Sequence, residues 1–123
     1  LHLPDDQIAT ICGSITEFDR EHGEISSVGI TMVDSVSVGK QRDIRTPIRL
    51  LPGLRKLEID YWGYSCPNMY HFEKPMVLQL NCRAGHKYEA KFREIDSKQI
   101  EVWIEDQQTK ERQTFGKEHL ERN

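Results

Sequence analysis

Cysteine and histidine, the residue types that hold structural zinc, occur as two closely spaced pairs in this chain. Cys66 and His71 form a C-x4-H pair, and Cys82 and His86 form a C-x3-H pair. A tetrahedral zinc site would need all four ligand atoms within about 2.0 to 2.3 Å of one ion. Cys82 and His86, however, flank an expected strand end and turn instead of a ligand-presenting knuckle. Zinc binding by Cys66, His71, Cys82 and His86 is therefore an alternative, and no cofactor is predicted.

The cysteines also allow a simpler interpretation, a disulfide between Cys66 and Cys82. Such a bond would close a loop of about 15 residues and contribute about 3 kcal/mol in the chain-entropy model. It requires an oxidising compartment. The cysteine count is odd, so one thiol is left over, and Cys12 in an apolar strand is expected to be that thiol. Three reduced thiols, packed as small hydrophobic groups, are the remaining alternative.

Nucleophilic chemistry would have to use Cys12 or His86. Cys12 has no histidine or acid beside it in the sequence to activate it, and His86 next to Gly85 is expected to bond to backbone at a turn. Carboxylates on the strands are expected on a solvated face, where nothing raises their pKa: Glu58, Asp60, Glu101 and Glu105. No catalytic residue is predicted, so the chain is not expected to be an enzyme, and a hydrolase is an alternative.

Aromatic residues are the candidates for binding. The segment from Gly63 to Pro75 is expected to be a loop, and its contact residues are predicted to be Tyr64, Tyr70, His71 and Phe72. Trp62 and Trp103 should project from the faces opposite the aliphatic rows. If both were exposed on one sheet they would form a binding platform. Burial beneath long charged neighbours or the tail is the expected outcome.

The elements that must position these residues are short strands. Apolar and polar residues alternate, and the expected strands are Gln7–Thr16, Ile25–Val33, Ser35–Val38, Ile44–Leu51, Leu54–Trp62, Met76–Cys82, His86–Arg93 and Gln99–Glu105. Pro47 makes its strand an expected edge strand. About seven short strands with regular turns predict an all-β, antiparallel β-sandwich, prealbumin-like or immunoglobulin-like. Residues 1–123 are expected to form one domain, with a core at about 7–106 and a polar tail at 107–123 of undecided structure.

Composition excludes several classes of function. The net charge of −3 lacks the basic excess of a nucleic-acid-binding surface. No apolar run approaches the roughly 18 residues that a membrane span requires. Phosphate-binding glycine loops and EF-hand loops are also missing from the sequence.

Four short motifs carry a family resemblance, which extends over about Ile25 to Thr109. They are Val28-x-Ile30 with Val33-Asp34, Leu51-Pro52-Gly53, Ala84-Gly85-His86-x-Tyr88, and Trp103-Ile104-Glu105-Asp106-x-x-Thr109. Together they resemble a group of small bacterial envelope lipoproteins of undefined role, and the LPG turn with its strand is also similar to PEGA-type surface domains. Two positions depart from the group: Ser35 replaces the usual glycine, and Leu54-Arg55 replaces a basic-His pair.

The resemblance implies a periplasmic or outer-membrane-anchored protein, held to the membrane by a lipid on an N-terminal cysteine. Cys12 lies too deep in a strand to be that cysteine, so the anchor is expected outside this chain. The function implied is a non-catalytic structural or interaction module that binds protein or cell-wall components and no nucleic acid. Recognition is expected through strand edges or the segment from Gly63 to Pro75.

Overall fold

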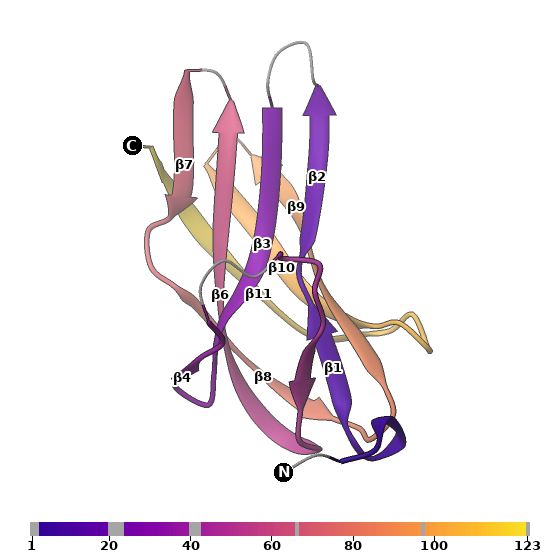
Figure 1. The fold of residues 1–123 in the computed structure, drawn as a ribbon. Coiled ribbons are helices and arrows are strands. Elements are labelled where there is room, and N and C mark those ends of the chain that lie inside the picture. The colour runs from indigo at the N-terminus through magenta and orange to yellow at the C-terminus, as the bar shows by residue number, and fades with distance from the viewer. Residues whose placement is uncertain (1–2, 20–23, 40–42, 66, 97, 123) are drawn as a thin grey trace.

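The computed structural model describes residues 3–19, 24–39, 43–65, 67–96 and 98–122, and most of them lie in β-strands (Figure 1). The all-β class is therefore confirmed. The elements are η1, a 3-10 turn (Asp5–Gln7), and the strands β1 (Ala9–Cys12), β2 (Ser14–Asp19), β3 (Glu24–Val33), β4 (Val36–Ser37), β5 (Ile48–Leu50), β6 (Gly53–Ser65), β7 (Asn68–Phe72), β8 (Met76–Cys82), β9 (Lys87–Asp96), β10 (Gln99–Asp106) and β11 (Arg112–Arg122). No helix in the described ranges is long and apolar enough to cross a membrane.

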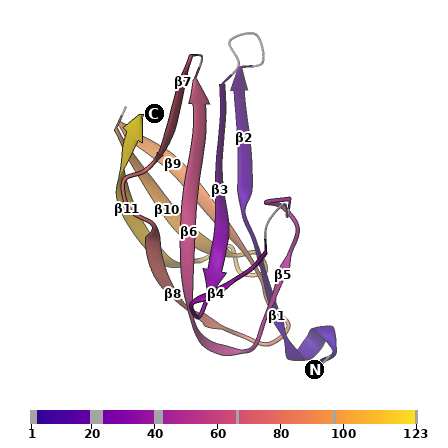
Figure 2. The same ribbon diagram turned by 60° about the vertical axis from the view of Figure 1, so that its left-hand side comes forward.

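The strands form one mixed sheet in the order β2-β3-β6-β7-β11-β10-β9-β1-β5, with β4 added to β3 and β8 to β6. The sheet curls, so that β9, β10 and β11 lie behind β3 and β6 (Figures 1 and 2). We call the front part, β2, β3, β4, β6, β7 and β8, the β3–β6 half. The rear part, β9, β10 and β11, is called the β9–β10 half. The described residues thus contain eleven strands where about seven were expected. Antiparallel pairing was expected throughout, but among the described strands β1 pairs with β9 in parallel.

Gly13 divides the first expected strand in two. Before it, β1 pairs with β9 and β5; after it, β2 pairs with β3. A side chain at Gly13 would overlap the carbonyl oxygen of Val28, so a residue with a Cβ cannot pass this point without moving the backbone of β3. The glycine therefore lets one continuous segment serve both halves of the sheet.

The core lies between the two halves. The alternation expected for Met76–Cys82, His86–Arg93 and Gln99–Glu105 is confirmed, because the inward residues of β8, β9 and β10 are buried while most of their neighbours are more exposed. The buried side chains from these strands and β6 include Leu57, Ile59, Met76, Leu78, Leu80, Tyr88, Ile100, Val102 and Ile104. Full burial of each large aliphatic side chain contributes about 1.5 to 3 kcal/mol.

Two turns explain motifs that the sequence singled out. Gly53 has φ +106°, a conformation that favours glycine, and it leads from the edge strand β5 into β6. Asp34 and Ser35 both have positive φ in the turn between β3 and β4. The Asp34 carboxylate accepts hydrogen bonds from the Lys56 N–H at 2.8 Å and from Arg55 Nη1 at 2.9 Å. This turn is thereby fastened to the first residues of β6.

Three expected elements have different bounds in the structure. The expected edge strand shortens to β5, which follows Pro47 directly and does lie at one end of the strand order. The expected loop from Gly63 to Pro75 is mostly a hairpin, since β6 continues to Ser65 and β7 returns from Asn68. The polar tail contains β11, which pairs with β10 and with β7.

Candidate functional site

The structure does not bring together the cysteines and histidines of the expected disulfide and zinc site. Cys82 pairs with Gly53 at the start of β6, whereas His71 pairs with Trp62 near its other end, roughly 30 Å away at about 3.4 Å per residue. Cys82 is a free thiol, so the predicted Cys66–Cys82 disulfide is wrong; Cys66 itself lies outside the described residues. Among the described residues, no three His, Cys, Asp or Glu side chains form a metal-binding group, which leaves the zinc alternative without support.

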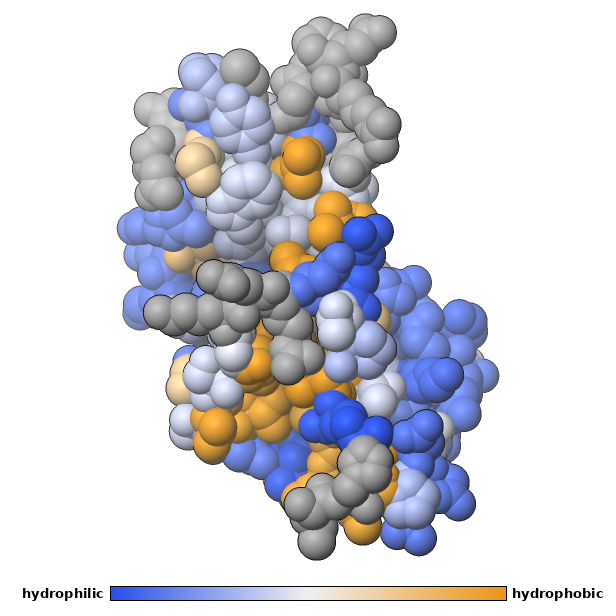
Figure 3. All heavy atoms as spheres, in the orientation of Figure 1, coloured by the Kyte–Doolittle hydropathy of each residue, from blue (hydrophilic) through white to orange (hydrophobic). Residues whose placement is uncertain are grey.

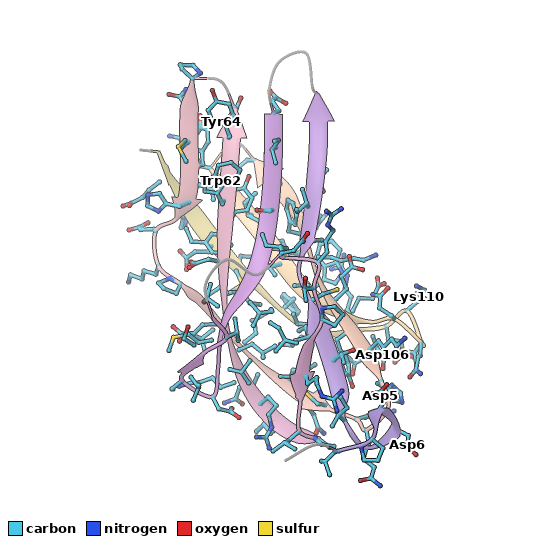
Figure 4. The ribbon with its side chains drawn as sticks, viewed as in Figure 1. Asp5, Asp6, Trp62, Tyr64, Asp106 and Lys110 are labelled. Carbon is cyan, nitrogen blue, oxygen red and sulfur yellow. The ribbon has the colours of Figure 1, made fainter. Side chains whose placement is uncertain are left out.

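His86 bonds to a buried carboxylate instead of a backbone group. Its Nδ1 lies 2.7 Å from Oδ2 of Asp106, a residue that is only 2 % exposed at the end of β10. Burial acts to raise the pKa of Asp106, but hydrogen bonds from His86 and from the Gln108 and Thr109 N–H groups outweigh it, and the pKa is lowered. The carboxylate is thus ionised and accepts, so Nδ1 of His86 donates. The pair joins the Gly85-His86 turn to the β10–β11 turn (labelled by Asp106 and Lys110 in Figure 4).

Cys12 has the surroundings of a core thiol. Its Sγ lies 3.9 Å from the carbonyl oxygen of Tyr88, and its pKa is raised by burial and then by the charge of Glu89. A nucleophilic cysteine needs the opposite shift, because the thiolate is the reactive form. Neither Cys12 nor His86 lines any of the cavities described below.

The two tryptophans lie on opposite halves of the sheet, so they cannot form one platform. Trp103 of β10 is covered as expected, by Arg112, whose guanidinium carbon lies 4.0 Å from the ring centroid. Nη1 of Arg112 also lies 3.5 Å from Oε1 of Glu101, and the same oxygen accepts a hydrogen bond of 2.8 Å from Nε of Arg93. On β6, by contrast, Trp62 is 43 % exposed, and the expectation that it is covered is wrong.

Trp62 lies at the centre of an apolar and aromatic surface on the outside of the β3–β6 half, here called the Trp62 face. Cross-strand register places two rows side by side on this face: Ile15, Ser27, Trp62 and His71, and next to them Ile25, Tyr64 and Met69. Ile15 and Met69 are exposed along with Trp62. Figure 4 shows Trp62 and Tyr64 as neighbours on the upper part of β6.

The four predicted contact residues divide between the two sides of the hairpin. Tyr64 and His71 belong to the Trp62 face. Phe72 points into the core, where it is 4 % exposed and stacks on Tyr61 with ring centroids 5.6 Å apart. Tyr70 also lies on the core side, beside a cavity of about 250 Å³ at the end of the sheet. Alternation along β7 therefore separates residues that a loop would have kept together.

A larger cavity, of about 340 Å³, adjoins Trp62. It lies between the outer surface of β3 and β6 and the β4–β5 segment, meaning residues 38–39 and 43–47. Its lining is mostly apolar or small: Ser27, Gly29, Ile30, Thr31, Val38, Ile44, Thr46, Ile48, Asp60 and Trp62. Hydrophobic residues gather on this side of the molecule between β4 and β5 (Figure 3). Ile44 packs over Gly29, where a Cβ would lie 3.1 Å from Ile44 Cγ1.

Asp60 is the carboxylate on the β6 side of this cavity. Asp60 is exposed, yet, contrary to the expectation from the sequence, its pKa is raised. Partial desolvation of its carboxylate is the main cause, the charge of Glu58 is the second, and His71 acts in the opposite direction. The Asp60 carboxylate makes no hydrogen bond or ion pair with another described residue. The sequence signal that could have located the site is the i, i+2 spacing of Asp60 and Trp62, which puts both on one face of a strand.

Comparison of the chain with protein-family models, with curated proteins and with solved structures gave no match. The functional conclusion therefore depends on the geometry of the Trp62 face and on the motifs in the sequence.

Proposed function

We propose that this chain is a non-catalytic recognition domain of the bacterial envelope, periplasmic or outer-membrane-anchored through a lipid outside residues 1–123. In this proposal the curled sheet is a prealbumin-like or immunoglobulin-like sandwich. Its role is to bind a protein or cell-wall component, and the Trp62 face is the surface that does so.

The observation that carries the proposal is the contrast between the two outer surfaces. On the β9–β10 half, Arg112 covers Trp103, and Glu101 is paired with Arg93 and Arg112. Phe115 is exposed on this half, but its neighbours Glu101, Arg112 and Gln113 are charged or polar. On the β3–β6 half, Trp62 stays 43 % exposed beside Ile15 and Met69. Exposed, contiguous aromatic and apolar side chains are enriched where proteins bind partners.

The remaining residues of the sequence motifs anchor the fold. His86 and Asp106 fix one end of the sheet, Gly53 turns the chain into β6, and Asp34 holds the β3–β4 turn. Each of these residues contributes to the fold, and none of them lines the cavity that adjoins Trp62. A scaffold with fixed ends that presents exposed aromatic and apolar side chains together suits surface recognition.

Cosedimentation with an isolated bacterial envelope fraction tests this function. With residues 1–123 prepared without a lipid, retention in the pellet would report recognition alone. We expect the wild type and Phe115→Ala to sediment with the envelope and Trp62→Ala to remain soluble. Phe115 is the matched control, because it is an aromatic residue on the β9–β10 half and is 62 % exposed. Equal behaviour of all three proteins would contradict the proposal.

A further inference from the structure

The cavity between Trp62 and the β4–β5 segment combines an aromatic ring, a carboxylate and small hydroxyls in a space of about 340 Å³. We propose that it holds one pyranose ring of an envelope glycan, stacked on Trp62 and hydrogen-bonded to Asp60. This inference rests on the proposed function and names the class of ligand that the Trp62 face takes.

Trp62 provides the stacking surface. Its cross-strand neighbours in register are Ser27, which is small, and His71. Neither β3 nor β7 therefore places a long aliphatic side chain directly opposite the indole. A pyranose ring has one face of C–H bonds with partial positive charge, and this face packs against the electron-rich face of an aromatic ring.

Asp60 and two hydroxyls provide the polar side of the cavity. Asp60 precedes Trp62 by two residues, about 7 Å along the same side of β6. Ser27 Oγ donates to the Trp62 carbonyl at 3.4 Å, and Thr31 Oγ1 donates to the Glu58 carbonyl at 3.2 Å. These hydroxyl protons are occupied, so the oxygens offer lone pairs. The polar atoms thus accept hydrogen bonds, and a ligand edged with hydroxyl donors matches them.

The size and floor of the cavity limit the ligand. About 340 Å³ is near the lower end of small-molecule sites, which span roughly 300 to 1,000 Å³, and it suits one ring of a chain that continues into solvent. The floor is apolar where Ile30, Val38 and Ile44 line it. An acyl chain would fit this floor but would leave the Asp60 carboxylate against methylene groups, which is unfavourable. An anionic ligand would meet the charge of Asp60, and the other carboxylate of the lining, Asp43, is paired with Arg45.

Fluorescence titration tests the site directly. Trp103→Phe leaves Trp62 as the only tryptophan, and this protein would be titrated with hexasaccharides of N-acetylglucosamine and of glucose. We expect a saturable change in Trp62 emission with at least one of them. Asp60→Asn and Gly29→Ala, made in the same background, should each weaken binding about tenfold or more, because the first removes a charged acceptor and the second adds a methyl group to the cavity wall against Ile44. Val77→Ala, on an exposed residue of β8, should bind like the parent.

Calorimetry with Trp62→Ala completes the test, since this variant has no fluorescent reporter in the site. Thermal unfolding of every variant would confirm that it is folded, and Trp62, being exposed, should tolerate replacement. No saturable response to either saccharide up to about 10 mM would overturn the glycan inference while leaving a Trp62-dependent envelope interaction intact. Saccharide binding that Trp62→Ala and Asp60→Asn leave unchanged would also overturn it.

Discussion

Replacement of Asp106 by alanine should lower the free energy of unfolding by about 3 to 5 kcal/mol. The carboxylate is 2 % exposed and accepts three hydrogen bonds, from His86 Nδ1 at 2.7 Å, from the Gln108 N–H at 2.9 Å and from the Thr109 N–H. Hydrogen bonds to a charged group contribute about 1.5 to 3 kcal/mol each, and they are not additive within one network. The alanine also leaves His86 without its partner.

Thermal and urea unfolding monitored by circular dichroism would measure this loss, which corresponds to a fall in Tm of roughly 10 to 20 °C. Asp96→Ala is the matched control. Asp96 makes the same kind of side-chain bond to an N–H two residues ahead, at 2.8 Å to Lys98, but it is exposed. Its replacement should change stability by less than about 1 kcal/mol. Equal losses for Asp96→Ala and Asp106→Ala would refute the anchoring role of the His86–Asp106 pair.

The same pair predicts a pH dependence. Because the pKa of Asp106 is lowered in the folded protein, its contribution is complete above the ordinary aspartate value of about 3.9 and is lost as the pH falls through the folded-state pKa. The wild type should therefore lose more stability than Asp106→Ala between about pH 5 and pH 2. Parallel curves for the two proteins would show that Asp106 contributes no pH-dependent stability.

Three further outcomes are expected. Burial raises the pKa of Cys82 to about 11, so its alkylation at pH 8, followed by mass spectrometry, should be about a hundredfold slower than in unfolded protein; rapid native labelling would contradict its burial. Ser35→Gly should raise the free energy of unfolding by about 0.5 to 1 kcal/mol in urea titrations, because Ser35 has φ 67°; a loss of stability would contradict this turn geometry. Gly13→Ala should destabilise by about 3 kcal/mol or more in the same assay, through its clash with the Val28 carbonyl; a neutral effect would argue against the close approach of Gly13 to β3.

Strands with clean alternation were predictable from the sequence. Met76–Cys82 coincides with β8, and the inward rows of β9 and β10 agree with the pattern of apolar residues. Pro47 correctly marked an edge strand, because proline cannot donate to a ladder of hydrogen bonds. The local alternation of apolar and polar residues was sufficient to predict a strand and its inward side chains where the strand buries one complete face.

The hairpin of β6 and β7 was missed because the segment from Gly63 to Pro75, which contains Pro67 and Asn68, was interpreted as a loop. In the structure Gly63 lies inside β6, and a Cβ there would be 2.5 Å from the Tyr61 hydroxyl oxygen. A glycine at this position allows the Tyr61 side chain to pack closely against the backbone of β6, and it does not mark a turn. Strand β11 was left undecided because its sequence is polar; in the structure it pairs with β10, and Met76 and Leu78 of β8 fill the space beside Gly116.

The candidate site depends on long-range pairings that a single sequence does not contain. Alternation predicted that Trp62 and Trp103 both face outward, but Arg112, which covers only Trp103, comes from the tail, whose structure the sequence left undecided. The cavity beside Trp62 likewise needs Ile44, from the β4–β5 segment, to lie over Gly29 of β3. The parallel pairing of β1 with β9 also joins segments that are distant in the sequence.

The recognition role of the Trp62 face is tested most directly by NMR of the ¹⁵N-labelled chain with soluble cell-wall fragments. The amide and indole N–H signals would be followed as the fragments are added. We predict that the shifted signals belong to Trp62, its indole included, and to Ser27, Gly29 and Asp60. Shifts confined to Trp103 and Phe115 on the β9–β10 half, or no shifts at all, would contradict this role.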